Sequence, residues 1–180
     1  MMAYDFEVIA KARAGDEEAF AALVKLHMPY VYRTAFAFVH RREEAEDAAQ
    51  EVFIKIYRSL PQLKEVQAFP SWFKQLISRT CLDRLKKGDV ALLADTDIAG
   101  KSVPSVAEEV ERRLIVREAI RKLNREHREV LLLREWQGYD YQEIAVFLGI
   151  PVGTVKSRLH TAREQLKKML NPRGEPEGRM

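Results

Sequence analysis

The sequence predicts an all-α protein: two small helical domains joined by a flexible acidic linker, the C-terminal one containing a helix-turn-helix. Three observations support this class. Apolar residues recur at intervals of three and four in both halves of the chain, while period-two alternation over a strand's length is absent. The 180 residues are 47% hydrophobic with only 8 Gly and 7 Pro, which allows folded cores and excludes a wholly disordered or collagen-like chain. Charge is segregated, so the net charge of +3 conceals acidic and basic segments.

An acidic segment divides the chain. Over residues 89–111, six acidic residues oppose Lys101 alone, which gives a net charge of −5, and Gly and Pro interrupt the helical period. We therefore expect this segment to be a linker between a first domain of residues 1–88 and a second of residues 112–170. Residues 171–180 have little to bury and should form a disordered tail.

The first domain is expected to begin with short helices. Asp16, directly after Gly15, is a good N-cap for the first of them. Its expected inward-facing residues are Phe20, Leu23 and Val24. Pro29 favours the start of the next helix, because proline suits a first helical turn. The apolar residues of the helix after that recur at helical spacing and are Ala45, Ala48, Ala49, Val52, Phe53, Ile56, Tyr57 and Leu60.

A further helix is expected from about Pro70 to a basic last turn before Gly88. Cations in a last turn followed by Gly are an ordinary helix end. Its aromatic and aliphatic residues should pack in the core, since aromatics at helical spacing are usually buried; these are Trp72, Phe73 and Leu76. Cys81, the single cysteine, is expected to be a small packed thiol rather than a reactive one.

The second domain carries the helix-turn-helix pattern. Asp140 and Glu143 have the spacing of a capping box, which predicts a helix start at this point. Gly149 supplies a left-handed turn and Pro151 cannot continue the helix, so the first helix should end here. The expected buried stripe of the second helix is Val155, Leu159, Ala162, Leu166 and Leu170.

The outer face of this second helix is basic and rich in hydroxyls. Over residues 152–170 five basic residues oppose Glu164 alone, a net charge of +4 that exceeds the charge of the whole chain. A plain helical hairpin has the same apolar spacing, but the charge favours a helix that enters the major groove of DNA. The outward-facing polar residues are Thr154, Lys156, Ser157, His160, Thr161, Arg163 and Lys167.

An enzymatic function finds little support. The four histidines have no metal-ligand spacing, no glycine-rich phosphate loop occurs, and no set of Ser, His and acid stands out. A single cysteine excludes a disulfide scaffold and a cysteine-based zinc site. We therefore expect neither catalysis, nor a bound metal, nor a cofactor.

The sequence also predicts a cytoplasmic protein. No stretch approaches the roughly 18 uninterrupted apolar residues of a membrane span. The first residues lack the basic-then-apolar order of a signal peptide.

At three places the chain resembles the extracytoplasmic-function (ECF) group of the sigma-70 family. Glu143-Ile144-Ala145, Leu148-Gly149-Ile150 and residues 151–160 are similar to the family's C-terminal DNA-binding region, although response-regulator effector domains share this style. Residues 45–53 resemble the segment that docks on core RNA polymerase, and residues 69–87 resemble the helix that reads the promoter −10 element. The resemblance covers residues 5–88 and 112–170, in the family's order.

This resemblance implies a sigma factor that directs promoter-specific transcription initiation, as a specificity subunit of RNA polymerase without a catalytic site of its own. Residues 1–88 would correspond to sigma region 2, which binds core polymerase and recognises and melts the −10 element. Residues 112–170 would correspond to region 4, which recognises the −35 element. The implied partners are core RNA polymerase, through the clamp helices of its largest subunit and its flap, promoter DNA, and an anti-sigma factor.

Physical spacing supports the expected polymerase-binding residues. Asp47, Gln50, Glu51 and Ile54 lie at i, i+3, i+4 and i+7, on a face opposite the predicted buried one. An acidic and amide face with one exposed Ile suits a basic helical partner, although a merely solvated face has the same pattern. The acidic linker also has two possible roles. In the family it threads into the polymerase near the RNA path, but its sequence is equally consistent with a plain tether between the domains.

The resemblance also implies two sets of DNA-binding residues. Those for the −10 element are Lys64, Lys74, Ser78, Arg79, Arg84, Lys86 and Lys87, and those for the −35 element are Gly153, Thr154, Lys156, Ser157, Arg158, His160, Thr161 and Arg163. Two positions depart from the family. Many relatives have Asn in place of Arg79 and Arg in place of Thr161, and a hydroxyl cannot make the bidentate contact of Arg to guanine. We therefore expect this chain to share the family's mechanism of promoter recognition, but not the promoter sequence that its relatives recognise.

Two other classes of protein compete with this interpretation. A stand-alone DNA-binding regulator would use only the helix-turn-helix and would not retain core polymerase. A helical interaction adaptor predicts that residues 112–170 have no salt-dependent affinity for DNA.

Overall fold

The structure is a computed structural model that describes residues 4–91 and 107–171, and every regular element in these ranges is helical. The chain divides into two compact units, unit 1 over Met1–Val90 and unit 2 over Ala91–Met180. The predicted all-α class with two helical units is confirmed. No helix in the described ranges has the length and apolar character needed to cross a membrane.

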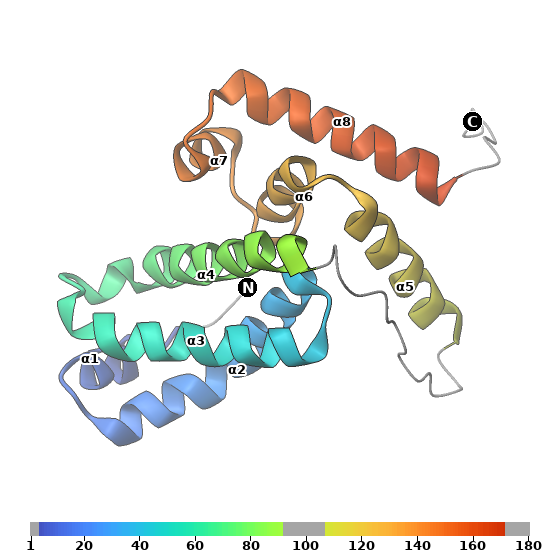
Figure 1. Cartoon of the computed structure of the whole chain (residues 1–180). Helices are drawn as coiled ribbons and strands as arrows, with labels where there is room; N and C mark the ends of the chain where they lie inside the picture. Colours follow the sequence, from blue (N-terminus) through green and yellow to red (C-terminus); the bar gives the residue numbers. More distant parts are fainter. Residues whose placement is uncertain (1–3, 92–106, 172–180) are drawn as a thin grey trace, which may run out of the picture. The chain divides into compact units, whose positions relative to one another are not determined.

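Unit 1 contains four α-helices within its described residues (Figure 1). They are α1 (Phe6–Arg13), α2 (Glu17–Val39), α3 (Arg42–Ser59) and α4 (Phe69–Ala91), and two single 3-10 turns, Leu60–Gln62 and Val66–Ala68, connect α3 to α4. Helix α1 was not predicted from the sequence, although Asp5 caps it by accepting hydrogen bonds from the backbone N–H groups of Glu7 and Val8. Because α1 has only eight residues and two buried side chains, its periodic signal is weak.

The prediction that Pro29 begins a new helix is wrong. Asp16 caps α2 as expected, accepting a hydrogen bond from Ala19 N, but the helix then continues through Pro29 to Val39. The buried face runs across the proline without a change of period, through Leu23, His27, Val31, Thr34, Ala35 and Phe38. Burial of this continuous face offsets the one backbone hydrogen bond that proline removes.

The core of unit 1 follows the predicted stripe of α3 with one exception, Tyr57. The buried residues are Ala45, Ala48, Ala49, Val52, Phe53 and Ile56, and Leu60 is buried in the first 3-10 turn. Tyr57, however, is exposed and packs edge-on against the ring of Phe20, itself only half-buried. Val24 on α2 is also half-buried rather than buried.

Helix α4 contributes aromatic and aliphatic residues to the same core. Phe69, Phe73 and Ile77 are fully buried, whereas Trp72 and Leu76 are half-buried at the edge. The helix does not end at Gly88 as predicted but reaches Ala91. Since α5 already begins at Ala107, both ends of the predicted linker are helical, and its middle, residues 92–106, lies outside the described residues.

Unit 2 is a second helical array with its own core (Figure 1). Its elements are α5 (Ala107–Lys122), α6 (Arg125–Leu131), a π-helical turn η3 (Leu132–Trp136), α7 (Tyr141–Leu148) and α8 (Val152–Leu170). Helices α5, α6 and α7 all pack against α8. Leu123, Leu131 and Ala162 form one buried cluster, against which Ile120 and Leu166 pack. Of the predicted tail, only Asn171 is described, and residues 172–180 lie outside the described residues.

The local chemistry of the helix-turn-helix is as predicted. Asp140 Oδ1 accepts a hydrogen bond from Glu143 N at 2.7 Å, and Asp140 N donates to Glu143 Oε2 at 2.7 Å. Gly149 ends α7 with φ 67°, in the left-handed region that favours glycine. Val155, Leu159 and Ala162 of the predicted stripe are buried, but Leu166 is only half-buried and Leu170 is exposed. The last turn of α8 therefore extends beyond the core.

Candidate functional site

The acidic face of α3 is turned away from the core of unit 1. Asp47 and Gln50 are exposed, Ile54 is half exposed to solvent, and Glu51 is intermediate. These four residues, which we call the α3 face, occupy the side of the helix opposite its buried alanines, as their spacing predicted. An exposed Ile between polar residues gives a flat helix face an apolar contact point for a partner.

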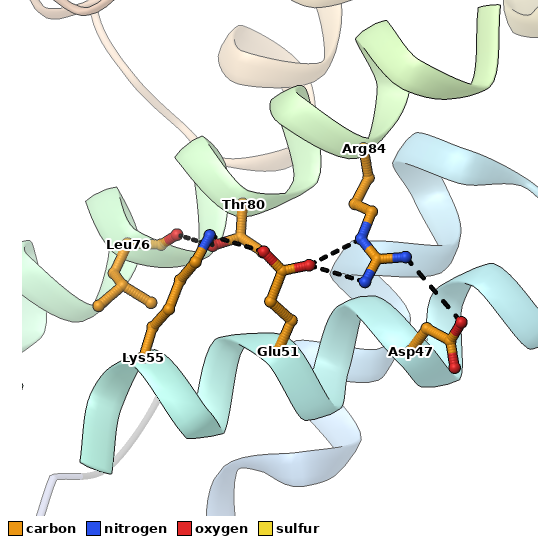
Figure 2. A network of polar contacts seen from close by, with 6 residues as sticks. All are labelled: Asp47, Glu51, Lys55, Leu76, Thr80 and Arg84. Carbon is orange, nitrogen blue, oxygen red and sulfur yellow. Dashed lines mark hydrogen bonds and ion pairs between the residues drawn. The ribbon is translucent and has the colours of Figure 1, made fainter. Parts of the chain in front are cut away.

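Glu51 is held by cations on both sides, as Figure 2 shows. Arg84 Nε on α4 donates to Glu51 Oε2 at 2.7 Å, and Lys55 Nζ lies 2.8 Å from Glu51 Oε1. Lys55 also donates to Thr80 Oγ1 at 3.2 Å, and that hydroxyl donates to the Leu76 carbonyl oxygen. Hydrogen bonding from Lys55 lowers the pKa of the Glu51 carboxyl, with Arg84 acting in the same direction and burial opposing both.

The predicted −10 residues differ in whether their side chains reach the surface, pair with a carboxylate or are buried. Arg79, Lys86 and Lys87 on α4 are exposed and Lys74 is half-buried, so these side chains reach the surface. Arg84 lies beside them in sequence, yet its guanidinium contacts carboxylates of α3. Lys64, the remaining predicted cation, is exposed in the segment between the two 3-10 turns.

Ser78 is not a surface residue, and its assignment to DNA binding is wrong for this structure. It is fully buried, and its Oγ has no hydrogen-bond partner among the described residues. Helix α4 turns its Ile77, Ser78 and Cys81 side toward the core, so a nucleic acid cannot reach the hydroxyl while the helix stays packed.

Arg13 also contributes to this region, although no sequence pattern predicted it. Arg13, at the end of α1, donates through Nη1 to the carbonyl oxygens of Leu63 and Lys64 at 3.2 and 3.0 Å. These contacts fix the segment that carries Lys64 to the first helix. No local sequence pattern predicts these hydrogen bonds, because the acceptors are backbone carbonyl groups about fifty residues further along the chain.

The predicted −35 residues all lie on α8, between its first turn and Arg163. Gly153, Lys156, Ser157, His160 and Arg163 are exposed, and Thr154, Arg158 and Thr161 are half-buried. Ser157 Oγ donates to the Thr154 carbonyl oxygen at 3.0 Å, which ties one hydroxyl to the helix backbone. The N-terminal half of α8 thus presents donors and a cation in the arrangement that a major groove accommodates.

Two arginines of α8 are paired with carboxylates from other elements of unit 2. Arg158 Nη2 lies 2.7 Å from Glu126 Oε2 on α6, and Arg163 contacts Glu135 of η3. Hydrogen bonding to Glu135, with a smaller effect of Tyr141, raises the pKa of Arg163. The charge of +4 counted along α8 is therefore partly neutralised by residues distant in sequence.

Neither a metal site nor a reactive thiol is seen in the described parts of the chain. Within residues 4–91 and 107–171, no group of three or more His, Cys, Asp or Glu side chains could hold a metal ion. Cys81 is fully buried, and burial raises the pKa of its thiol to about 12, as expected for a packed cysteine.

Family comparisons match both units. The family model described as sigma-70 region 2 matches residues 23–90, and the one described as sigma-70, region 4 matches residues 113–166. The RNA polymerase sigma-H factor of Pseudomonas aeruginosa is 32% identical and covers 93% of this chain and 94% of its own length. The ECF RNA polymerase sigma-E factor of Escherichia coli is 30% identical over 93% of this chain and 95% of its own.

Solved structures share the fold. The structure of CnrH in complex with the cytosolic domain of CnrY matches with a TM-score of 0.63 at 24% identity, covering 94% of this chain and 99% of CnrH. The sigma factor RpoE of Bartonella quintana, solved with the anti-sigma factor NepR, matches with a TM-score of 0.60 at 20% identity, covering 84% and 96%. The two region matches, with the identities of 32% to sigma-H and 30% to the ECF factor sigma-E, show that the chain belongs to the extracytoplasmic-function group of sigma-70 family RNA polymerase sigma factors, which direct promoter-specific transcription initiation.

Proposed function

We propose that this sigma factor binds core polymerase through the α3 face and reads promoter DNA with the surface residues of α4 and α8. The observation that supports the proposal is that the acidic face and the basic surfaces lie on different helices. An acidic face with an exposed Ile lies on α3, whereas exposed cations and hydroxyls lie on α4 and on the first half of α8.

The α3 face suits a basic helical partner such as the clamp helices of the polymerase's largest subunit; we assign no residue to the flap. Asp47 and Gln50 offer a carboxylate and an amide within one helical turn, and Ile54 offers an apolar contact one turn further. Glu51 adds a second carboxylate to this face, which in the free chain is paired with Lys55 and Arg84. Burial of Ile54 would supply affinity, and the charges would select a basic partner and orient it.

For the −10 element we propose Lys64, Lys74, Arg79, Lys86 and Lys87, with Ser78 removed from the set because it is buried. These cations neutralise phosphates without reading sequence. Arg84 belongs to this set only when it is released from its carboxylate partners.

For the −35 element we propose Gly153, Thr154, Lys156, Ser157, His160 and Thr161, with Arg158 and Arg163 contributing from their ion pairs. Gly153 lies in the first turn of α8, where the positive end of the helix dipole attracts a phosphate. Thr161 in place of Arg alters which base is preferred at its position.

We assign region 2 function to residues 1–88, linker function to residues 89–111 and region 4 function to residues 112–170, with residues 171–180 as a tail. The protein acts in the cytoplasm as a specificity subunit, and catalysis of RNA synthesis belongs to the polymerase. Because the structural neighbours RpoE and CnrH were solved with NepR and with the cytosolic domain of CnrY, we propose that an anti-sigma factor also controls this chain.

The test combines the purified chain with core polymerase and a library of genomic fragments, and maps the transcript start sites. We expect starts downstream of shared −35 and −10 elements, together with co-purification of the chain and core polymerase. Absence of specific initiation on every fragment would overturn the proposal. DNA binding without retention of core polymerase would instead indicate a stand-alone regulator.

A further inference from the structure

Arg84 stands between the two surfaces proposed for unit 1. It lies on α4 near the cations proposed for DNA, yet both Nε and Nη2 contact Glu51 Oε2 at 2.7 Å. Its third nitrogen, Nη1, lies 3.9 Å from Asp47 Oδ2. Figure 2 shows the guanidinium turned toward α3, so every nitrogen that could hold a phosphate faces a carboxylate of the α3 face.

The Glu51 carboxylate has little capacity left for a new cation. Lys55 engages Oε1 at 2.8 Å and is itself anchored on Thr80, while Arg84 engages Oε2. The side chains of Arg84 and Glu51 are only 29% and 32% exposed, so salt screens this pair less than the exposed pairs elsewhere on α3. A basic partner that approaches Glu51 must therefore compete with Arg84 or Lys55 for the same oxygens.

We propose that Glu51 and Asp47 hold Arg84 away from DNA in the free protein, and that a basic partner binding these carboxylates releases Arg84 to a DNA phosphate. This inference rests on the proposed function, since it takes the α3 face as polymerase-binding and α4 as DNA-binding. Linkage is reciprocal: a phosphate that draws Arg84 away also frees Glu51 for the polymerase. Binding of polymerase and binding of DNA by unit 1 are thus coupled through one side chain.

The test measures the affinity of the free full-length chain for a fluorescent single-stranded DNA oligonucleotide at several salt concentrations. Glu51→Gln should strengthen binding several-fold and steepen the dependence of log affinity on log salt by about 0.7, the contribution of one added phosphate contact to a single strand. Asp47→Asn, at an exposed position that does not threaten folding, should give a smaller gain in the same direction.

Glu46→Gln is the matched control. Glu46 lies on the same helix, and its substitution changes the net charge equally, but its ion-pair partner is Arg42 on α3 itself. It should not steepen the salt dependence. Equal gains in affinity and equal slopes for Glu51→Gln and Glu46→Gln would overturn the proposal, because the effect would then be one of net charge alone.

A double-mutant cycle with Arg84→Gln isolates the masked cation. In the wild-type background Arg84→Gln should change DNA affinity little, whereas in the Glu51→Gln background it should cancel the gain. An equal loss in both backgrounds would show that Arg84 is never masked and would also overturn the proposal. All of these measurements omit polymerase, so they test the masking of Arg84 separately from the proposed function. Failure of promoter-directed transcription would overturn the proposed function, but it would not change the result of the double-mutant cycle.

Discussion

At the scale of single residues, the structure places His27 in apolar surroundings. The ring is 3% exposed and lies 5.4 Å from the ring of Tyr4, 5.1 Å from that of Phe73 and 6.3 Å from that of Phe69. Burial lowers the pKa of His27, because the charged imidazolium is poorly solvated there. The residue therefore joins α2 to α4 as a neutral aromatic ring.

This burial predicts an acid sensitivity of unit 1. Because the pKa of His27 is lower in the folded state than its unfolded value of about 6.5, the unfolded state binds more protons as the pH falls. The free energy of unfolding should therefore fall below about pH 6.5, with a contribution from His27 of up to about 1.4 kcal/mol per pH unit. Urea unfolding at pH 7, 6 and 5 measures it. His27→Phe should show a shallower pH dependence than the wild type, and identical slopes would contradict the assignment.

Two glycines of the helix-turn-helix offer substitutions with opposite expected effects. Gly149 has φ 67° and Gly153 is helical, and a Cβ would meet no atom within 4 Å at either position. Gly149→Ala should therefore destabilise unit 2 by about 1–2 kcal/mol through backbone strain alone. Gly153→Ala should stabilise it by roughly 0.5–1 kcal/mol, because Gly lowers helix stability. Amide hydrogen exchange in α7 and α8 measures both, and changes of the same sign would show that strain at Gly149 is not the cause.

At the scale of elements, α8 combines two functions along its length. Its buried stripe of Val155, Leu159 and Ala162 fixes it to unit 2, while its first turns present polar side chains to solvent. Glu126 and Glu135 hold two of its arginines from α6 and η3. The cations of α8 therefore differ in their freedom to bind phosphate, although they look equivalent in the sequence.

The proposed −35 contacts lie in the N-terminal half of α8, and this position predicts unequal roles for Lys156 in that half and Lys168 in the last turn. Lys156→Ala should weaken binding of the full chain to a −35 duplex and lower the slope of log affinity against log salt by about 0.9, as expected for one lost phosphate contact. Lys168, exposed in the last turn, is the matched control, because its substitution removes the same charge. Fluorescence anisotropy titrations measure both. Equal effects would mean that α8 acts through its overall charge rather than through its first turns.

At the scale of the whole molecule, the small net charge of +3 is the sum of opposed local charges. Each unit has its own buried core and its own proposed surfaces. Loss of a surface in one unit should therefore leave the other unit's binding intact.

Ile54→Glu tests this independence. A charge at the apolar contact of the α3 face should abolish retention of core polymerase and promoter-directed transcription. Affinity of the free chain for a −35 duplex should stay within about twofold, since a surface substitution in unit 1 leaves the core of unit 2 unchanged. Leu26→Glu is the control, because Leu26 is an exposed apolar residue of α2. Retained polymerase binding in Ile54→Glu, or its equal loss in Leu26→Glu, would show that the α3 face is not the contact. Co-purification and run-off transcription measure these outcomes.

Much of the fold was predictable because its signals are local. The cap at Asp16, the capping box at Asp140 and the left-handed turn at Gly149 depend on residues within one helical turn, and the sequence contains all of them. The opposite placement of the α3 face and the buried alanines follows from helical periodicity alone. The local signal at Pro29 failed because packing of the continuous buried face of α2 outweighs the preference of one residue. The local signal at Gly88 also failed, since α4 continues to Ala91.

The sequence by itself therefore determined the helical class, the helix-turn-helix and the α3 face, since these depend on spacing along the chain, while the family resemblance supplied the candidate DNA-binding residues. Only the tertiary structure decided which candidate side chains are available. It buries Ser78, pairs Arg84 with Glu51, and pairs Arg158 with Glu126. The physical reason is that burial and ion pairing join residues that lie about thirty positions apart, and no periodicity within a helix encodes which partner the neighbouring helix will present.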